Sequence, residues 1–408
     1  MLPRIDGQYL ILLSQPLNEP GVNARSAGYF GQHYDAGFNQ VGQSLDIRVK
    51  LPLRVLPNPG YLFSLGIDPH SCQKGLEEIK ALEQVNALLS SDNLDVFTWS
   101  SRHLESIDAA CLRNFRKASL LYSCRSLTDL NVVLKVCALF GSLKIKATES
   151  LKDAALQLGY SGSFVKGVNS DRTAALMHIL KTISENDPAI LQFFMHSVQA
   201  KVDLIKRTIA QGKFLVDVDS KGILEVVKPL NIEDHLLESV CCNGSEVYLK
   251  YLKLSDSPLL APVSLLTEQR QMDNNFSLAH AIEMINSCDL TALAKPRLPF
   301  QYLFFKQLSD AEKQDYQKNL NKDPRAIDML MSGSGQYRSL AFLCRADNSS
   351  GSLVENERIS FENFTIKEIR QHINEYLTGC KSLRSIADPE NEADTALYNR
   401  IERYPYDL

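Results

Sequence analysis

Two carboxylates, separated by one residue, end an apolar run in the stretch KFLVDVDSKGILEVV, residues 213–227. On a β-strand, alternate side chains share a face, so Asp217 and Asp219 are expected to point the same way. Hard divalent cations prefer carboxylate oxygens, and substrate phosphates usually complete their shell. The spacing therefore favours a site for Mn²⁺ or Mg²⁺. The same stretch is typical of an exposed hairpin, with Asp entering the turn and Gly222 where a positive φ is needed, so both interpretations stay open.

Two other blocks precede this carboxylate pair: NLDVFTW at 93–99 and NSDRTAALMHIL at 169–180. Their order resembles that of the Asp-x-Asp glycosyltransferases of bacterial toxins and effectors. The resemblance implies that Trp99 stacks on the base of a nucleotide-sugar, that Asp171 and Arg172 contact the sugar or phosphate, and that the carboxylate pair holds the metal on the diphosphate. It implies sugar transfer to a protein acceptor. By themselves the residues also fit a core ring at Trp99 and a helix cap at Asp171.

A second candidate site is Cys72, where a loop runs into a strong helical pattern in GIDPHSCQKGLEEIKALEQ. A thiol at a helix N-terminus has its thiolate stabilised by the helix dipole, which is where papain-like enzymes place their nucleophile. His33, with Asp35 nearby, is the candidate base if the chain folds back. The alternative prediction is a cysteine-dependent hydrolase or acyltransferase. A third hypothesis is a non-catalytic protein-interaction module that docks its partner on the helices.

Composition narrows the class of protein. The 408 residues are 44% hydrophobic and 23% charged, the balance of a globular protein of two or three domains. The net charge of −4 is spread along the chain without a basic stripe, which predicts no nucleic-acid partner. No apolar run reaches the roughly 18 residues that a membrane span needs. The nine cysteines contain no CxxC pair, which argues against a zinc cluster and favours a reducing, cytosolic location.

The periodicity of apolar residues predicts an α+β or loosely α/β fold, in which a helical block separates two strand-bearing regions. Within it we expect one continuous helix over 188–212, a helix over 310–320 and a strand over 337–346. The predicted regions are a β-rich N-terminal region at 1–70, a helical block at 71–212, an α+β region at 213–381 and an acidic flexible tail at 382–408.

The end of the tail, DPENEADTALYNRIERYPYDL, is acidic and poor in large aliphatic residues. Ordering its backbone costs roughly 1 to 2 kcal/mol per residue, which so little apolar area does not offset. We therefore expect a chain that ends near Ser385 to melt within about two degrees of the full chain. In composition the tail resembles the C-terminal signals of effectors exported by type IV secretion. That resemblance implies delivery into a host cytosol without an N-terminal signal peptide.

Overall fold

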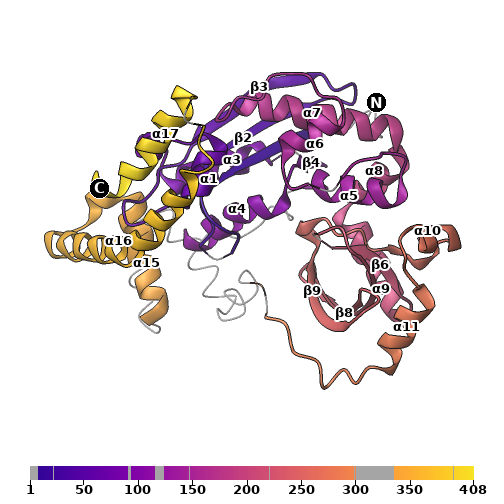
Figure 1. Cartoon of the computed structure of the whole chain (residues 1–408). Coiled ribbons are helices and arrows are strands. Elements are labelled where there is room, and N and C mark those ends of the chain that lie inside the picture. Colours follow the sequence, from indigo (N-terminus) through magenta and orange to yellow (C-terminus); the bar gives the residue numbers. More distant parts are fainter. Residues whose placement is uncertain are drawn as a thin grey trace.

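The structure is a computed structural model that describes residues 8–21, 23–90, 93–114, 124–146, 148–219, 221–297, 299, 335–388 and 390–408. Two β-sheets and numerous helices make up these residues (Figure 1), so the predicted α+β class is confirmed. Within the described ranges, no helix has the length and apolar character of a membrane span. The helix expected over 310–320 lies outside the described residues.

The first sheet has the strand order β3-β2-β1-β4-β5. β1 pairs antiparallel with β2, and β2 with β3, whereas β1 with β4 and β4 with β5 are parallel pairs. The hairpin between β2 and β3 is closed by Asp35, whose carboxylate accepts from the Gly37 and Asn39 amides at 2.8 and 2.9 Å. The strands are β1 (Tyr9–Pro16), β2 (Ser26–Tyr34), β3 (Gln40–Arg48), β4 (Asp95–Thr98) and β5 (Ser126–Asp129).

Helices cover both faces of this sheet because successive strand residues point to opposite sides. Leu10 and Leu12 pack in one core with α3 and α4, while Ile11 and Leu13 pack in another with the helices of the opposite face. Each fully buried side chain of this size stabilises the fold by roughly 1.5–3 kcal/mol relative to exposure. The helices are α3 (Glu78–Leu88) and α4 (Ser101–Arg113) on one face, and α5 (Leu130–Phe140), α6 (Leu151–Gln157), α7 (Asn169–Asn186) and α8 (Pro188–Phe194) on the other.

The helix expected over 188–212 is divided in two. α8 ends at Phe194, and α9 (Val198–Ala210) begins after Ser197. The Ser197 hydroxyl accepts from the Ala200 amide at 3.2 Å, as an N-cap does, and the Val198 amide donates to the Arg125 carbonyl at 2.9 Å. A cap and a contact distant in sequence therefore replace the helical hydrogen bonds that the apolar period alone predicts.

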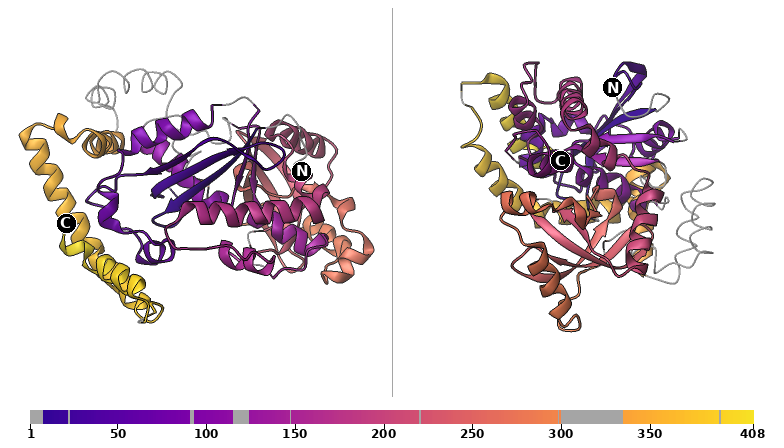
Figure 2. Two further views of the ribbon diagram at one scale, coloured as in Figure 1. Left: turned by 90° about the horizontal axis from the view of Figure 1, so that it is seen from above. Right: turned by 90° about the vertical axis from the view of Figure 1, so that its right-hand side faces the viewer.

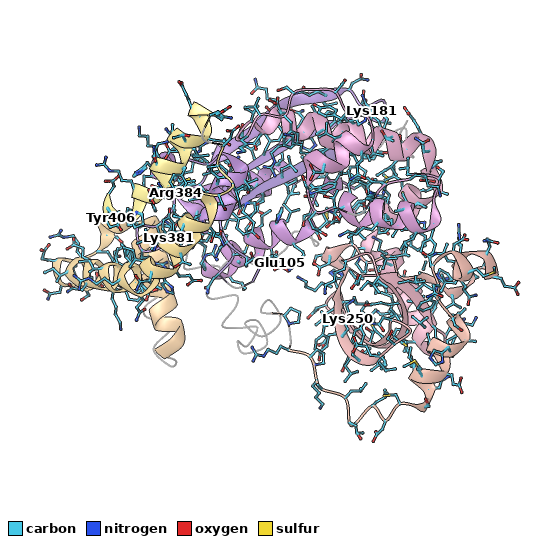
Figure 3. All side chains as sticks on the ribbon, in the orientation of Figure 1. Glu105, Lys181, Lys250, Lys381, Arg384 and Tyr406 are labelled. Carbon is cyan, nitrogen blue, oxygen red and sulfur yellow. The ribbon has the colours of Figure 1, made fainter. Side chains whose placement is uncertain are left out.

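The second sheet, with the order β10-β6-β7-β8-β9, is antiparallel throughout. α9 packs with residues of one core of this sheet and α11 with another. Glu105 on α4, labelled in Figure 3, pairs with Lys253 at the end of β9, and the Ser257 hydroxyl donates to the Leu127 carbonyl at 3.2 Å. The elements are β6 (Leu215–Val218), β7 (Leu224–Glu233), β8 (Leu236–Cys242), β9 (Val247–Lys253), β10 (Ala261–Pro262), α10 (Glu268–Asp273) and α11 (Leu278–Ser287).

The segment expected to be a flexible tail differs in the structure. Residues Glu392–Arg403 form α17, which lies against the long helix α16 (Glu355–Leu383) and the short helices α1 (Pro59–Leu65) and α2 (Pro69–Cys72). Figure 2 shows α16 and α17 together at one end of the molecule. The tail orders because its few apolar residues share one helix face and enter a common core: Leu397, Tyr398, Ile401 and Tyr404.

The strand expected over 337–346 is also replaced by a helix, α15 (Gly335–Asn348). A short apolar run without alternation fits a buried strand or a helix equally well, so the period could not decide. Tertiary contacts anchor the end of the helix. The Asn348 side chain donates to Asn114 Oδ1 at 2.7 Å and accepts from the Ile79 amide at 3.1 Å.

Candidate nucleic-acid interface

The first sheet has a topological switch point between β1 and β4. From β1 the chain continues through β2 and β3 on one side of the sheet, whereas β4 leads to β5 on the other side. Open α/β sheets bind ligands in the crevice outside the carboxyl ends of strands at such a point. Here those ends carry Ser14 and Gln15 on β1 and Thr98 on β4, and both α4 and α7 begin nearby.

Amides and hydroxyls fill the end of β1. The buried Gln15 side chain donates to Asn169 Oδ1 at 3.1 Å, and Asn169 in turn donates to Asp46 Oδ1 at 3.0 Å. The Ser14 hydroxyl lies 2.9 Å from that of Ser26 and 3.0 Å from that of Ser106 on α4. These contacts join β1, β2, β3, α4 and α7 at one place, so the crevice is built by segments that are far apart in the sequence.

A positive charge lies beside this network. Arg172, in the first turns of α7, is 8% exposed and reaches Asn169 Oδ1 at 3.5 Å. Burial lowers the pKa of Arg172 to about 10, which still leaves it charged at neutral pH. Burial, followed by the charges of Arg172 and Arg102, lowers the pKa of His103 on α4 to about 4. His103 is therefore neutral at pH 7, and the positive charge of the crevice comes from Arg172.

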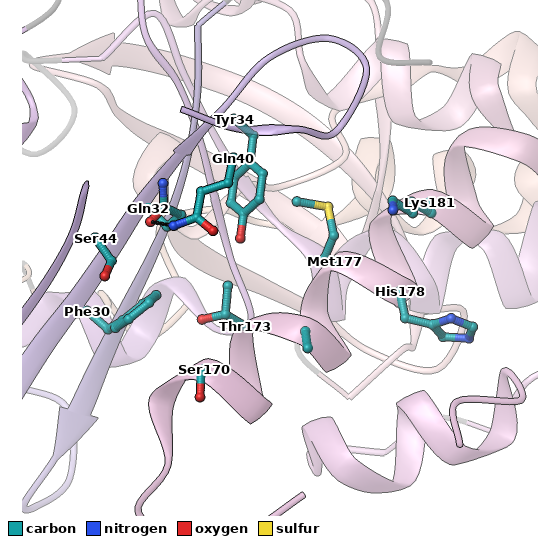
Figure 4. A pocket seen from close by; sticks show the side chains of 11 residues that line it. Phe30, Gln32, Tyr34, Gln40, Ser44, Ser170, Thr173, Met177, His178 and Lys181 are labelled. Atoms are coloured by element: carbon teal, nitrogen blue, oxygen red, sulfur yellow. Dashed lines mark hydrogen bonds between the residues drawn. The ribbon is translucent and has the colours of Figure 1, made fainter. Parts of the chain in front are cut away.

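A groove of about 490 Å³ adjoins the crevice between the β2–β3 hairpin and α7 (Figure 4). Gln40 donates to Gln32 Oε1 at 2.7 Å, and Gln32 donates to the His33 and Val41 carbonyls at 2.9 and 3.0 Å. Aromatic rings, amides and one lysine together offer stacking, hydrogen bonding and charge. The groove is lined by Phe30, Gln32, Tyr34, Gln40, Ser44, Ser170, Thr173, Ala174, Met177, His178 and Lys181.

The carboxylate pair predicted from the sequence lies elsewhere, in the antiparallel β6–β7 hairpin of the second sheet. Asp217 is buried and accepts from the Leu259 amide at 2.9 Å. Asp219 accepts from the Lys221 and Ile223 amides, both at 2.8 Å, and so closes the turn. Both carboxylates thus hold backbone amides of the second sheet, as the hairpin interpretation describes.

Asp217 allows a test of this structural role. Burial, only partly offset by Lys250, raises its pKa to about 6. When a carboxyl has a higher pKa in the folded than in the unfolded chain, the protein loses stability as pH rises from the unfolded-state pKa to the folded-state pKa. We therefore expect Asp217→Asn, which keeps an acceptor for the Leu259 amide, to raise the free energy of unfolding at pH 7 by about 2 kcal/mol and to leave it unchanged below about pH 4.

Urea unfolding at the two pH values measures this difference, and Asp219→Asn is the matched control. The control should stay within about 0.5 kcal/mol of the wild type because its amide oxygen can still close the turn. A loss of stability in Asp217→Asn at pH 7, together with stabilisation by Mn²⁺ of the wild type alone, would instead restore the predicted metal role.

Trp99 and Asp171 also have structural partners. The Trp99 ring is 4% exposed, and its Nε1 donates to the Glu149 carbonyl at 2.9 Å. The Asp171 carboxylate accepts from the Ser163 hydroxyl and the Val165 amide, both at 2.8 Å, so it is directed to the loop before α7. Neither side chain is free for a nucleotide-sugar.

Cys72 is fully buried in the core that α17 completes. Burial raises the pKa of its thiol to about 11, the opposite of what a nucleophile needs. Its sulfur lies 3.8 Å from the Asp68 carbonyl, and His33 belongs to β2 of the first sheet. This environment describes a small core residue rather than a catalytic one.

Of the sequence-predicted site residues, only Arg172 reaches the crevice. Gln15, His103 and Asn169 were not singled out from the sequence. The available signal was the pair of polar residues that directly follows the buried run YLILL of β1, because ligand-binding side chains are commonly placed where buried strands end.

This architecture is the fold of exonuclease I, a class of DNA-degrading enzyme. A crystal structure of exonuclease I in complex with the inhibitor BCBP is similar with a TM-score of 0.80, at 17% identity over 99% of this chain and 100% of that chain. The zinc-bound form of an Escherichia coli exonuclease I–ssDNA complex gives 0.78, at 17% identity over 98% and 99%. The E. coli enzyme with a dA16 oligonucleotide gives 0.79, at 16% identity over 98% and 100%. No protein-family model and no curated protein matches the sequence.

These similarities overturn the interpretation as a metal-dependent glycosyltransferase, together with its nucleotide-sugar and the export-signal resemblance. The cysteine-enzyme and interaction-module alternatives gain no support from them. The prediction of no nucleic-acid partner is contradicted as well, because the similar structures include complexes with single-stranded DNA. Net charge failed as a guide because contacts with a strand depend on local charge and stacking rather than on the total.

One similar structure is a zinc-bound form, and a divalent cation at the crevice of this chain would need anionic oxygen ligands. Across the described ranges, no three His, Cys, Asp or Glu side chains gather as a metal site requires. At the switch point the chain has Ser14, Gln15 and Asn169, with the cation Arg172 beside them. Uncharged amides and a guanidinium do not form the oxygen-rich anionic cage that a hard cation needs. The described residues of the crevice therefore do not fit a divalent metal.

Proposed function

We propose that this chain binds single-stranded DNA on an exonuclease I fold and holds the strand without metal-dependent hydrolysis. The main support for this proposal is the composition of the switch-point crevice. It contains a buried arginine and amides but, among the described residues, no carboxylate cluster. Similarity to structures with bound oligonucleotides over at least 98% of both chains supports a strand as the ligand.

The groove beside the crevice offers the chemistry that a strand requires. Figure 4 shows Phe30 and Tyr34 on the side of the sheet, facing the α7 residues Met177 and Lys181. Aromatic rings stack on bases of any sequence, and each such contact is worth about 1–3 kcal/mol. The Lys181 ammonium supplies a partner for a backbone phosphate. The predicted preference is for unpaired bases with little sequence discrimination.

Hydrolysis of a phosphodiester by this fold would require a nucleophile and a group that stabilises the departing oxyanion. Divalent cations provide both in two-metal sites. Gln15 and Asn169 carry no charge, and neither can hold such a cation without carboxylate neighbours. We therefore infer binding rather than cleavage as the outcome when a strand reaches the crevice.

The cytosolic location expected from the sequence stays a prediction. All nine cysteines are free thiols, and seven of them are buried. We infer a reducing compartment from this usage.

Fluorescence anisotropy with a labelled dA16 oligonucleotide tests the proposed function. In EDTA and low salt we expect a Kd of about 1–10 µM, with affinity falling steeply as salt rises because counterions are released from the strand. A blunt duplex of the same length should bind more weakly, since its bases cannot stack in the groove. In Mg²⁺ or Mn²⁺, the oligonucleotide should keep its full length on a denaturing gel.

Lys181→Ala and Lys206→Ala are the matched variants for this measurement. Both lysines are on helices, but only Lys181 lines the groove. In Lys181→Ala alone, loss of one phosphate contact should weaken binding. It should also reduce the slope of log affinity against log salt concentration by about one. Shortening of the oligonucleotide in Mg²⁺ would show that the chain is a nuclease, and absence of binding at low salt would refute the proposal altogether.

A further inference from the structure

We propose that Arg172 and His103 form a metal-free phosphate site at the switch point, which takes one phosphate group of the bound strand. The inference rests on the proposed function and gives its crevice a specific ligand chemistry. Four features of the described residues support the phosphate site: a guanidinium without an ionic partner, a nearby imidazole, a helix start without a side-chain cap and carboxylates that have other partners.

Among the residues that the structure describes, the Arg172 guanidinium has no ionic partner. It is more than nine-tenths buried, and its one hydrogen bond is the 3.5 Å contact with the neutral amide oxygen of Asn169. Burial is the only cause that shifts its pKa, and no described carboxylate contributes to that shift. A buried charge left unpaired is costly, so its retention indicates an anion that binds there. Arginine's planar fork matches the oxygens of a phosphate.

His103 lies in the first turn of α4, which covers the face of the first sheet opposite to α7. The Ser106 hydroxyl lies 3.0 Å from that of Ser14 at the end of β1 and donates to the His103 carbonyl at 2.9 Å, which places this turn of α4 beside the crevice. After burial, the positive charge of Arg172 is the next largest cause that lowers the pKa of the His103 imidazole. No hydrogen bond of the ring is found among the described residues. A neutral imidazole N–H can donate to a phosphate oxygen, so His103 complements the guanidinium without requiring a proton from solution.

The start of α7 provides further donors. This helix of 18 residues begins after Val168, whose side chain cannot cap it, so no side-chain hydrogen bond satisfies its first amides. The dipole of a helix and the free amides of its first turn favour an anion. Arg172 lies one turn into the same helix, so the amides and the guanidinium belong to one rigid element.

Two carboxylates, one next to Arg172 in the chain and one bonded to Asn169, have other partners. Asp171, adjacent in the chain, is held by the Ser163 hydroxyl and the Val165 amide of the preceding loop. The exposed Asp46 accepts from the Asn169 side chain at 3.0 Å. The Arg172 guanidinium is thus available to a ligand, and its positive charge selects an anion.

Thermal unfolding with inorganic phosphate tests this site on the full chain. Phosphate should raise the Tm of the wild type by about 2 °C more than that of Arg172→Met, because a ligand that binds only the folded state stabilises it. The general salting effect of phosphate acts on both proteins alike, so their difference reports the site. Without phosphate, Arg172→Met should have the higher Tm, since it removes an unpaired buried charge.

Equal phosphate shifts in both proteins, or a lower Tm of Arg172→Met without phosphate, would overturn the site, because the second result shows that Arg172 serves the fold. If Arg172→Met does not fold, NMR of the wild type with isotope-labelled histidines tests the phosphate site instead. Among the eight histidines, the resonance that His103→Gln removes should move during phosphate titration, and a stationary resonance overturns the proposal.

The oligonucleotide and phosphate results separate the two proposals. Oligonucleotide binding that Arg172→Met leaves unchanged supports the proposed function and refutes the phosphate site. A phosphate shift that depends on Arg172, in a chain that does not bind dA16, supports the site and refutes the function. When both hold, Arg172→Met should weaken dA16 binding at least about tenfold, as expected for loss of a charge-assisted contact.

Discussion

Replacing Glu78 by Gln should lower the free energy of unfolding by about 3–5 kcal/mol, because it removes the shared counter-ion of two buried arginines. Glu78, at the start of α3, lies 2.7 Å from Arg113 on α4 and 3.5 Å from Arg25 next to β2. Asn114 donates to the same carboxylate at 2.9 Å. Only 11% of the Glu78 side chain is exposed, so water cannot replace these contacts.

The pH dependence of stability should report the same carboxylate. Burial alone would raise the pKa of Glu78, but Arg113 and Arg25 outweigh it and hold the pKa at about 2. A carboxyl with a depressed folded-state pKa contributes stability that is present above its unfolded pKa of about 4.3 and is lost as pH falls toward 2. Urea unfolding from pH 7 to pH 2 should therefore show a steeper loss in the wild type than in Glu78→Gln.

Glu77→Gln is the control, because Glu77 is the adjacent residue and pairs with the exposed Lys80 at 2.9 Å. Exposed ion pairs contribute about 0–1 kcal/mol, so this variant should unfold almost as the wild type does. An equally small effect of Glu78→Gln would mean that Asp347, 3.7 Å from Arg25, compensates the buried charge alone.

Removal of residues 386–408 should destabilise the chain by about 5 kcal/mol or more, with a fall in Tm of roughly 10 °C or failure to fold. The truncation deletes α17 and exposes the core around Leu62 and Phe63 that it covers. It also removes two hydrogen bonds: a part-buried one from Gln73 to the Tyr404 hydroxyl at 3.0 Å, and a buried one from the Tyr376 hydroxyl to the Ile401 carbonyl at 2.7 Å.

Circular dichroism melts of three proteins measure this contribution. Beside the truncated chain, Ile401→Ala should cost about 2–5 kcal/mol because it leaves a cavity in a fully buried position. Arg403→Ala, on the exposed side of the same helix, should change stability by less than about 0.5 kcal/mol. If the truncated chain melts within two degrees of the full chain, the result would support the flexible tail that the composition predicts.

The fold alone does not decide between binding and cleavage of a strand. The switch point brings β1, β2, β3, α4 and α7 together, and the groove along α7 is lined by neutral and basic groups. Function thus depends on which side chains occupy the crevice and not on the fold itself. Here amides and an arginine occupy it.

The sequence by itself determined most local elements. The continuous apolar run YLILL predicted β1, which is buried along its whole length, the run LDVF predicted β4, and periods of three and four predicted α3 to α7. The Asp219 turn also follows from local chemistry, since Gly222 adopts a φ of 85° that other residues rarely reach. These features depend on neighbours within a few positions, which is why periodicity and turn residues suffice to predict them.

Only the tertiary structure decided where the chemistry lies. Gln15 and Asn169 are separated by 154 positions yet form a hydrogen bond, and the order of strands in the sheet creates their meeting point. The pairing of Glu78 with Arg113 and the docking of α17 likewise join distant segments. Local periodicity contains no information about such pairs, because it reports which face of an element is buried and not what buries it. The carboxylate pair looked like a site in the sequence for this reason, while the neutral and basic crevice did not.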